Sequence, residues 1–249
     1  MAESVRRVKC TVMYHGARFD GWQRQPEGRT VQGTIEAVLT RMHQRSTTIT
    51  GSGRTDAKVH ALGQVFHFDT TLKMDEASWI HAFNAQLPLD VKVIDAEFVP
   101  STFHARYGVI RKQYEYLIYK GPIQPFNYET HCCVESTLNV DAMRKAMSAL
   151  IGTHDFSAFC ANSFKETPNQ VRTIMRFEVE ESEDELRFVI EGDGFMRYQI
   201  RMMMACIIDI GKGKLRITDL QTILDSRDKQ AYSGMAEACG LYLTEVEYR

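Results

Sequence analysis

The chain has 249 residues, a formal net charge of −2, and 44% hydrophobic and 25% charged residues, with no long polar or low-complexity tract. This composition is typical of a globular protein and excludes a largely disordered or fibrous one. The N-terminus has no apolar signal core, and no run approaches the ~18 apolar residues of a membrane span, so we expect a cytoplasmic protein without a membrane segment.

The first part of the chain has the element order β-α-β-β-α-β. Apolar and polar side chains alternate over residues 8–14, which predicts a strand. Apolar side chains then recur at helical spacing over residues 31–42, after Thr30, a residue type that suits a helix N-cap. The remaining elements expected here are a short β segment at 46–50, a strand at 64–69, a helix at 75–86 and a strand at 91–99.

The second part repeats this order. It begins with a long strand predicted to contain Tyr107, Tyr114, Tyr116 and Leu117. A hairpin follows, in which one strand is expected to direct inward Val171, Thr173, Met175, Phe177 and Val179. After the acidic turn at 181–185, the returning strand is expected to direct inward Leu186, Phe188 and Ile190. Helices are predicted at 140–150, 196–210 and 218–226, and a closing strand at 241–248.

Two such units predict an α+β protein made of two ferredoxin-like halves, residues 1–105 and 106–249. Each half would have a four-stranded sheet with helices on one face. We expect the two sheets to form one continuous mixed or antiparallel sheet, with the helices on one side. The uncovered side would then be a broad floor suited to RNA.

The distribution of charge agrees with an RNA partner better than the total does. Residues 178–193 carry a local charge of −7, which leaves +5 on the rest of the chain. This pattern indicates a basic face with one acidic hairpin pointing elsewhere. Ordinary solvated charge is the alternative interpretation.

Cysteine and histidine residues form no metal-binding pattern. The six cysteines are scattered, and no Cys/His group has metal-ligand spacing, so we expect reduced thiols and no bound metal. We interpret His60, His104 and His154 as structural or RNA-contacting residues, because none stands in a nucleophile or metal motif.

The segment most informative about chemistry is GSGRTDAKVHA at residues 51–61, which is expected to form an exposed loop between two strands. Its glycines permit a tight backbone path, and Arg54 and Lys58 could meet phosphate groups. Asp56 lies between these cations, which favour its ionised form. The alternative is a simple connecting turn in which Asp56 acts as a cap.

This segment resembles the motif G-R-T-D-x-G-V-H-A of the tRNA pseudouridine synthase A family. Further blocks similar to that family lie at 20–25, 30–33, Asn84 with 87–88, 103–106, 154–156, 194–195 and 240–243. The resemblance implies a cofactor-independent reaction in which the glycosidic bond of uridine breaks and C5 of the uracil rejoins the ribose. It assigns Asp56 as the catalytic carboxylate, either a nucleophile at C1′ or a base at C2′.

The resemblance also implies roles for other residues. Tyr114 corresponds to an active-site tyrosine that packs against uracil, although a tyrosine in an alternating strand can equally be a core residue. Arg201 corresponds to an arginine that pairs with the catalytic aspartate, and Arg54 to a residue that supports base flipping. The full set expected to bind substrate is Arg54, Lys58, Tyr114, Phe195, Leu243, Arg24 and Arg106.

The implied substrate is tRNA, modified at positions 38–40 of the anticodon arm by a homodimer. A non-catalytic RNA-binding protein or chaperone, and an N-glycoside hydrolase that releases uracil, are the rival functions. The sequence departs from the family pattern at Lys58, where glycine is usual, and at Met202, Ala205 and residues 234–239. We expect Lys58 to adopt an ordinary right-handed or extended backbone conformation.

Overall fold

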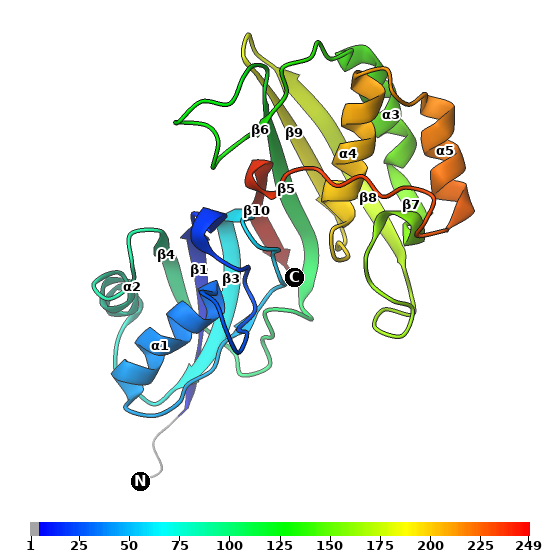
Figure 1. Ribbon diagram of the computed structural model, residues 1–249. Helices are drawn as coiled ribbons and strands as arrows, with labels where there is room; N and C mark the ends of the chain where they lie inside the picture. Colours follow the sequence, from blue (N-terminus) through cyan, green and yellow to red (C-terminus); the bar gives the residue numbers. More distant parts are fainter. Residues whose placement is uncertain (1–4) are drawn as a thin grey trace. The chain divides into compact units, whose positions relative to one another are not determined.

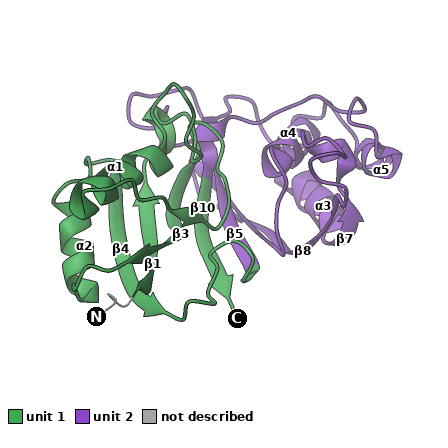
Figure 2. Ribbon diagram, turned by 90° about the horizontal axis from the view of Figure 1, so that it is seen from below, with its two compact units in different colours: residues 1–110, 242–249 green, residues 111–241 purple. Residues whose placement is uncertain are grey.

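The computed structural model describes residues 5–249, so residues 1–4 of the predicted N-terminal half lie outside the described residues. The chain divides into two compact units (Figure 2). The first unit consists of residues up to 110 together with 242–249, and the second of residues 111–241. Both contain strands and helices, and the predicted α+β class is confirmed. Over residues 5–249, no helix combines the length and apolar character needed to cross a bilayer.

The sheet of the first unit has the strand order β4-β1-β3-β10 (Figure 1). Its strands are β1 (Arg6–Tyr14), β2 (Thr50–Gly51), β3 (His60–Thr70), β4 (Val91–Val99) and β10 (Leu241–Tyr248). Neighbouring strands are antiparallel except β3 and β10, which pair in parallel, and β2 pairs with β3 outside this path. The helical elements are η1 (Gly16–Arg18), α1 (Val31–His43) and α2 (Glu76–Asn84).

The helices of this unit pack on one face of its sheet. The α1 helix begins where the Thr30 side chain accepts a hydrogen bond from the Gly33 N–H, as predicted. In α2, the Trp79 ring lies edge-on to Phe68 of β3, with 5.0 Å between ring centroids. His43 of α1 also contacts the Phe68 ring. Because neighbouring residues of a strand point to opposite faces, His67 points to the face without helices.

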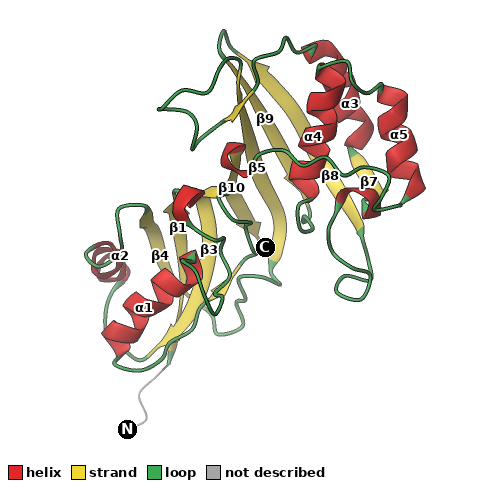
Figure 3. Ribbon diagram, viewed as in Figure 1, coloured by secondary structure: helices red, strands yellow, loops and turns green. Residues whose placement is uncertain are grey.

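The second unit has the strand order β5-β9-β8-β7 and three α-helices gathered on one face (Figure 3). Its strands are β5 (Val109–Tyr119, in this unit from residue 111), β6 (Cys132–Cys133, parallel to β5), β7 (Gly152–Asp155), β8 (Val171–Glu181) and β9 (Glu185–Gly192). Its helical elements are α3 (Val140–Leu150), η2 (Ser157–Phe159), α4 (Gln199–Gly211), α5 (Ile217–Ser226) and η3 (Ala238–Gly240). The short strands β6 and β7 were not expected from the sequence.

Several boundaries differ from the predicted ones. Tyr107 precedes β5 in a turn, and the segment at 46–50 contributes only Thr50 to β2. The α4 helix begins at Gln199 rather than Met196, because Tyr198 has a left-handed backbone with φ of 65°. That conformation keeps the helix from extending towards the N-terminus.

The predicted facing of β8 is wrong over part of the strand. Val171 and Met175 are exposed, whereas Ile174 and Phe177 are buried. A register shift between Ile174 and Arg176 interrupts the alternation. An extra residue in one strand moves the following side chains to the other face, so a strict two-residue period fails there.

The closing strand β10 joins the first unit. The repeat pattern places this strand in the second half, whereas Tyr242 and Leu243 pair with His60 and Ala61 of β3. The pairing brings the last residues of the chain beside a strand that begins about 180 positions earlier.

Candidate active site

The loop that carries Asp56 runs from residue 52 to 59, between β2 and β3, and is fixed by backbone hydrogen bonds. The Thr55 carbonyl accepts from the Trp22 N–H at 3.1 Å, and the Lys58 N–H donates to the Phe19 carbonyl at 3.1 Å. The loop also packs closely on Gly21, which has φ of +94°. A Cβ atom at Gly21 would come within 2.8 Å of the Thr55 carbonyl oxygen. Glycine is therefore required where residues 20–22 pass beneath the loop.

Buried side chains hold the same loop from the sheet. The hydroxyls of Tyr14 and Thr55 share a hydrogen bond of 2.7 Å. Burial raises the pKa of Tyr14, so this hydroxyl stays neutral. The Ser52 hydroxyl donates to Gln64 Oε1 at 2.6 Å, and Gln64 Nε2 donates to the Gly53 carbonyl at 3.1 Å. The part of the loop that precedes Asp56 is thus anchored to β1 and β3.

The side chains at the tip of the loop differ in exposure. Asp56 is half-buried, while Arg54, Ala57 and Lys58 are exposed. Asp56 also closes a turn, because its carbonyl accepts from the Val59 N–H at 3.2 Å. The loop therefore presents one partly shielded carboxylate, with two cationic side chains exposed on either side of it.

The predicted backbone conformation of Lys58 is wrong. Lys58 has φ of 66°, in the left-handed region, and it occupies the third position of the turn from Asp56 to Val59. That position of a turn with a positive φ favours glycine. The chain keeps a lysine where its backbone costs about 1 kcal/mol or more.

The residues predicted to contact RNA include two further arginines. Arg54 belongs to this loop, and Arg24 belongs to the sequence block at 20–25. Arg54 Nε donates to Gln23 Oε1 at 3.1 Å. Arg24 Nη1 lies 3.2 Å from Glu36 Oε2, and the Glu36 side chain is buried. The contact with Gln23 orients Arg54, and sequence patterns gave no separate role to Gln23.

The other two predicted site residues of the first unit have different surroundings. Leu243 is buried in β10. Arg106 is exposed in the turn before β5, and the neighbouring Ala105 N–H donates to His67 Nδ1. His67 lies seven residues along β3 from His60, which at about 3.3 Å per residue is about 23 Å. Within the unit, Arg106 is therefore far along β3 from His60, the residue that follows the Asp56 loop.

In the second unit, the structure brings together two residues that the resemblance assigned to the site. Tyr114 of β5 is 7% exposed and lies opposite Ile190 of β9. Its ring meets Phe195 edge-to-face, with centroids 5.3 Å apart and an interplanar angle of 82°. Tyr116 is fully buried and donates its hydroxyl hydrogen to the Glu237 carbonyl at 2.9 Å. The Tyr114–Phe195 pair forms an aromatic corner, whereas Tyr116 is a core residue.

Arg201 is the third residue of α4, and two contacts hold its guanidinium group. Its Nε donates to the Ala236 carbonyl at 2.9 Å, and its guanidinium carbon lies 5.4 Å from the centroid of the Tyr198 ring. Arg197 covers the same ring at 4.6 Å. Tyr198, the left-handed residue before the helix, thus contacts the guanidinium of Arg201. No sequence pattern identified this contact, because it depends on the backbone angle of Tyr198.

The family of the chain follows from comparison with known proteins. A family model described as tRNA pseudouridine synthase matches residues 11–108 and 146–249. This chain belongs to the tRNA pseudouridine synthase family. It is 45% identical to a tRNA pseudouridine synthase A of an Exiguobacterium species. The alignment covers 98% of this chain and 98% of the relative. It is 40% identical to the Bacillus subtilis tRNA pseudouridine synthase A, over 97% of this chain and 99% of the relative.

The match to the pseudouridine synthase family includes the Asp56 loop, Phe195, Arg201 and Leu243, whereas Tyr114 lies between the two matched ranges. A solved Cbf5-Nop10-Gar1 complex aligns with 94% of this chain and 57% of the complex chain. Its identity is 13% and its TM-score 0.37, too low to bear on function. Among residues 5–249 of this pseudouridine synthase family member, no three His, Cys, Asp or Glu side chains cluster as metal ligands would.

Proposed function

We propose that this protein isomerises uridine to pseudouridine at positions 38–40 in the anticodon arm of tRNA, with Asp56 as the catalytic carboxylate. The observation that carries the proposal is the fixed loop at 52–59, in which the only acidic side chain is half-buried between two exposed cations. A single ionised carboxylate held on a rigid backbone is what the reaction requires next to a ribose.

The reaction rearranges one nucleoside without a second substrate. The bond between N1 of uracil and C1′ of ribose breaks, and a bond between C5 and C1′ forms. The hydrogen at C5 leaves as a proton, and N1 gains a proton. Asp56 acts at C1′ as a nucleophile or at C2′ as a base, and the detached uracil must stay within the site until it rejoins the sugar.

The remaining predicted residues divide into two roles. The Tyr114–Phe195 pair is proposed to provide an aromatic surface on which the uracil ring stacks. Stacking of this kind contributes about 1–3 kcal/mol per base. Arg201 is proposed to keep the carboxylate ionised. Its side chain is restrained by Ala236 and Tyr198, which reduces the entropy lost when a charged partner binds.

The basic side chains are proposed to contact the RNA backbone. Arg54 and Lys58 are exposed beside Asp56, and Arg24 remains largely exposed although it pairs with Glu36. We also propose that the protein acts in the cytoplasm, as its sequence led us to expect, and as a homodimer, as the resemblance implied. Leu243 is proposed as apolar wall for the substrate site.

Substitution of Asp56 by asparagine tests the catalytic assignment. We expect Asp56→Asn to abolish release of tritium from tRNA labelled at uridine C5, while the dissociation constant for tRNA stays within about tenfold, because phosphate contacts dominate binding. Asp95→Asn is the matched control, since Asp95 is an exposed acid on β4 of the same unit, and it should keep full turnover.

Two further measurements separate the rival functions. Isomerisation leaves the mass of the RNA unchanged, whereas an N-glycoside hydrolase would release free uracil. Turnover retained in Asp56→Asn would remove Asp56 from catalysis, and a wild-type protein that binds tRNA without forming pseudouridine would be a binding protein. An unchanged pH–rate profile in Arg201→Ala would contradict the role of Arg201 in holding the carboxylate ionised, whereas Arg201→Lys, which keeps the charge, should retain more of the wild-type profile.

A further inference from the structure

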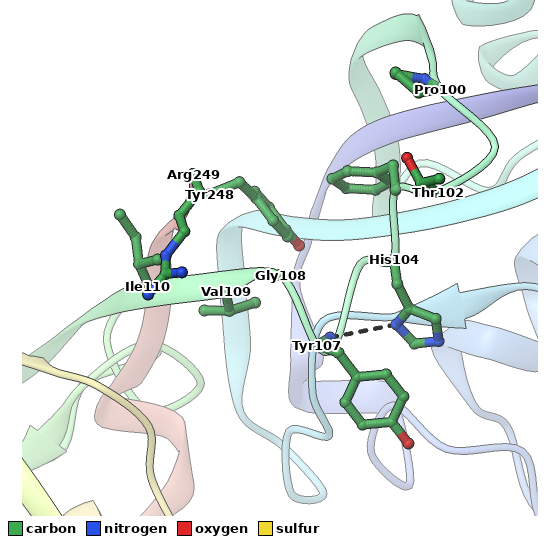
Figure 4. Close-up of a pocket in the computed structure, with 10 residues that line it drawn as sticks. Pro100, Thr102, His104, Tyr107, Gly108, Val109, Ile110, Tyr248 and Arg249 are labelled. Carbon is green, nitrogen blue, oxygen red and sulfur yellow. Dashed lines mark hydrogen bonds between the residues drawn. The ribbon is translucent and has the colours of Figure 1, made fainter.

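A pocket of about 630 Å³ lies in the first unit, at the end of the sheet where β4 leads into β5 (Figure 4). This volume is within the range of about 300–1,000 Å³ that small-molecule sites occupy. Its lining is mainly aromatic and aliphatic, with the polar side chains of Thr102, His104 and Arg249. The lining residues include Phe103, His104, Tyr107, Val109, Tyr248 and Arg249.

Tyr107 projects its ring from the turn that borders this pocket. The side chain is 80% exposed, although tyrosine is a large and largely apolar residue. One face of the ring is covered by the His104 ring, with centroids 4.3 Å apart and an interplanar angle of 28°. The two rings form a stacked pair that extends into solvent, which Figure 4 shows beside the pocket.

The turn that carries the pair is rigid. His104 Nδ1 accepts from the backbone N–H groups of Arg106 and Tyr107, at 3.1 and 3.3 Å. Between these residues, Ala105 is fully buried: its N–H donates to His67 Nδ1 at 3.1 Å, and its carbonyl accepts from the Tyr248 hydroxyl at 2.7 Å. The exposed ring therefore stands on a fixed backbone, and little conformational entropy would be lost when a ligand stacks on it.

Hydrogen-bond donors and positive charge surround the pair. Because Nδ1 of His104 accepts two hydrogen bonds, its Nε2 carries the ring hydrogen and is a donor. The Arg106 guanidinium is exposed and has no salt-bridge partner among residues 5–249, and Arg249 lines the pocket. Lys9 lies 5.1 Å from the Tyr248 ring but is paired with Glu97. Arg106 is thus an exposed cation beside the pair, and Arg249 is a second one at the pocket.

This feature is built from residues other than those at the tip of the Asp56 loop, although Ser52, the first residue of that loop, contacts Tyr248. His67, which binds Ala105, is about 23 Å along β3 from His60, and it points to the face of the sheet without helices. An aromatic platform beside an unpaired arginine is the arrangement with which proteins hold single-stranded nucleotides.

We propose that the His104–Tyr107 pair is a second RNA subsite, which stacks an unpaired base of the tRNA on the free face of Tyr107 while Arg106 binds an adjacent phosphate. The inference rests on the proposed function for the identity of the RNA, but not for the chemistry of the subsite. The subsite would contribute to affinity and to positioning of the tRNA, at a distance from the uridine that reacts.

The test compares the dissociation constants of Tyr107→Ala, Tyr107→Phe and wild type for an unmodified full-length tRNA transcript. Loss of a stacked base worth about 1–3 kcal/mol weakens binding about fivefold to 150-fold, so Tyr107→Ala should show a loss in this range. Tyr107→Phe should bind within about twofold of wild type, because it keeps the ring. Arg106→Ala should lower the slope of log Kd against log salt by about one.

Phe126→Ala is the matched control, because Phe126 is a 94% exposed aromatic residue of the second unit that has no ring or cation partner within residues 5–249. We expect it to bind tRNA as wild type does. Wild-type affinity in Tyr107→Ala, or an equal loss in Phe126→Ala, would overturn the subsite. A change of molecular mass of Tyr107→Ala in sedimentation would also overturn it, because the ring would then lie between copies of the chain.

Turnover of the wild-type protein distinguishes this proposal from the proposed function. If wild type forms pseudouridine and Tyr107→Ala binds tRNA normally, the subsite alone is refuted. If wild type binds tRNA through Tyr107 but forms no pseudouridine, the subsite stands and the proposed activity is refuted. Thermal unfolding of each variant verifies that the turn still folds.

Discussion

Replacement of Lys58 by glycine should stabilise the protein. A left-handed backbone costs an L-residue about 1–2 kcal/mol, and glycine adopts it freely, although glycine also increases the entropy of the unfolded chain by about 0.4–1 kcal/mol. With φ of 66° at Lys58, the difference is a gain of about 0.5–1 kcal/mol in the free energy of unfolding. For a chain of 249 residues this raises Tm by about 1–4 °C.

Ala57→Gly is the matched control, because Ala57 is the preceding exposed residue of the same turn and does not have a positive φ. We expect it to lower the free energy of unfolding by about 0.5–1 kcal/mol, so the two glycine substitutions should have opposite signs. Urea unfolding followed by circular dichroism measures both, with the midpoint compared at constant m.

A midpoint for Lys58→Gly equal to or below that of wild type would refute the backbone argument. The same variant tests the phosphate contact proposed for the lysine side chain. Turnover should persist, and the slope of log Kd for tRNA against log salt should fall by about one. An unchanged affinity and slope would show that the ammonium group does not bind phosphate, and lost turnover at unchanged affinity would assign Lys58 to catalysis.

Two further predictions concern buried polar groups of the first unit. Thr55→Val should lower the free energy of unfolding by about 1–3 kcal/mol, because it leaves the buried Tyr14 hydroxyl without its 2.7 Å partner. The double variant Tyr14→Phe/Thr55→Val should lose less than the sum of the two single variants. Additive losses in urea unfolding would contradict this coupling. Burial, with Arg7 and His104 nearby, lowers the pKa of His67 from 6.5 to about 4. Folding favours the neutral ring, so the stability that this shift contributes is complete above pH 6.5. It is lost progressively as the pH falls from 6.5 to 4, by up to about 3 kcal/mol in total. His67→Gln should therefore show a smaller loss of stability between pH 7 and pH 5 than wild type, and an equal loss would rule out His67 as the titrating group.

Sequence patterns alone determined most of the local structure and the chemistry to look for. The alternation over residues 8–14 and the helical spacing after Thr30 correctly predicted β1 and α1, because side-chain periodicity records which face of an element is buried. The motif around Asp56 led to the family, which the comparisons confirmed. The predictions of β1, α1 and the Asp56 motif each depend only on a short segment of the chain.

The features that the sequence did not predict depend on contacts between distant segments. Lys58 is held in the left-handed region because its N–H binds Phe19 and the loop packs on Gly21. The β10 strand joins the first unit because it pairs with β3, a choice that a repeat pattern does not encode. Tyr107 was expected within a strand, yet His104 captures its N–H and turns the chain before β5 begins. In each case the backbone conformation depends on a hydrogen bond to another segment, and that segment takes its position only when the whole unit folds.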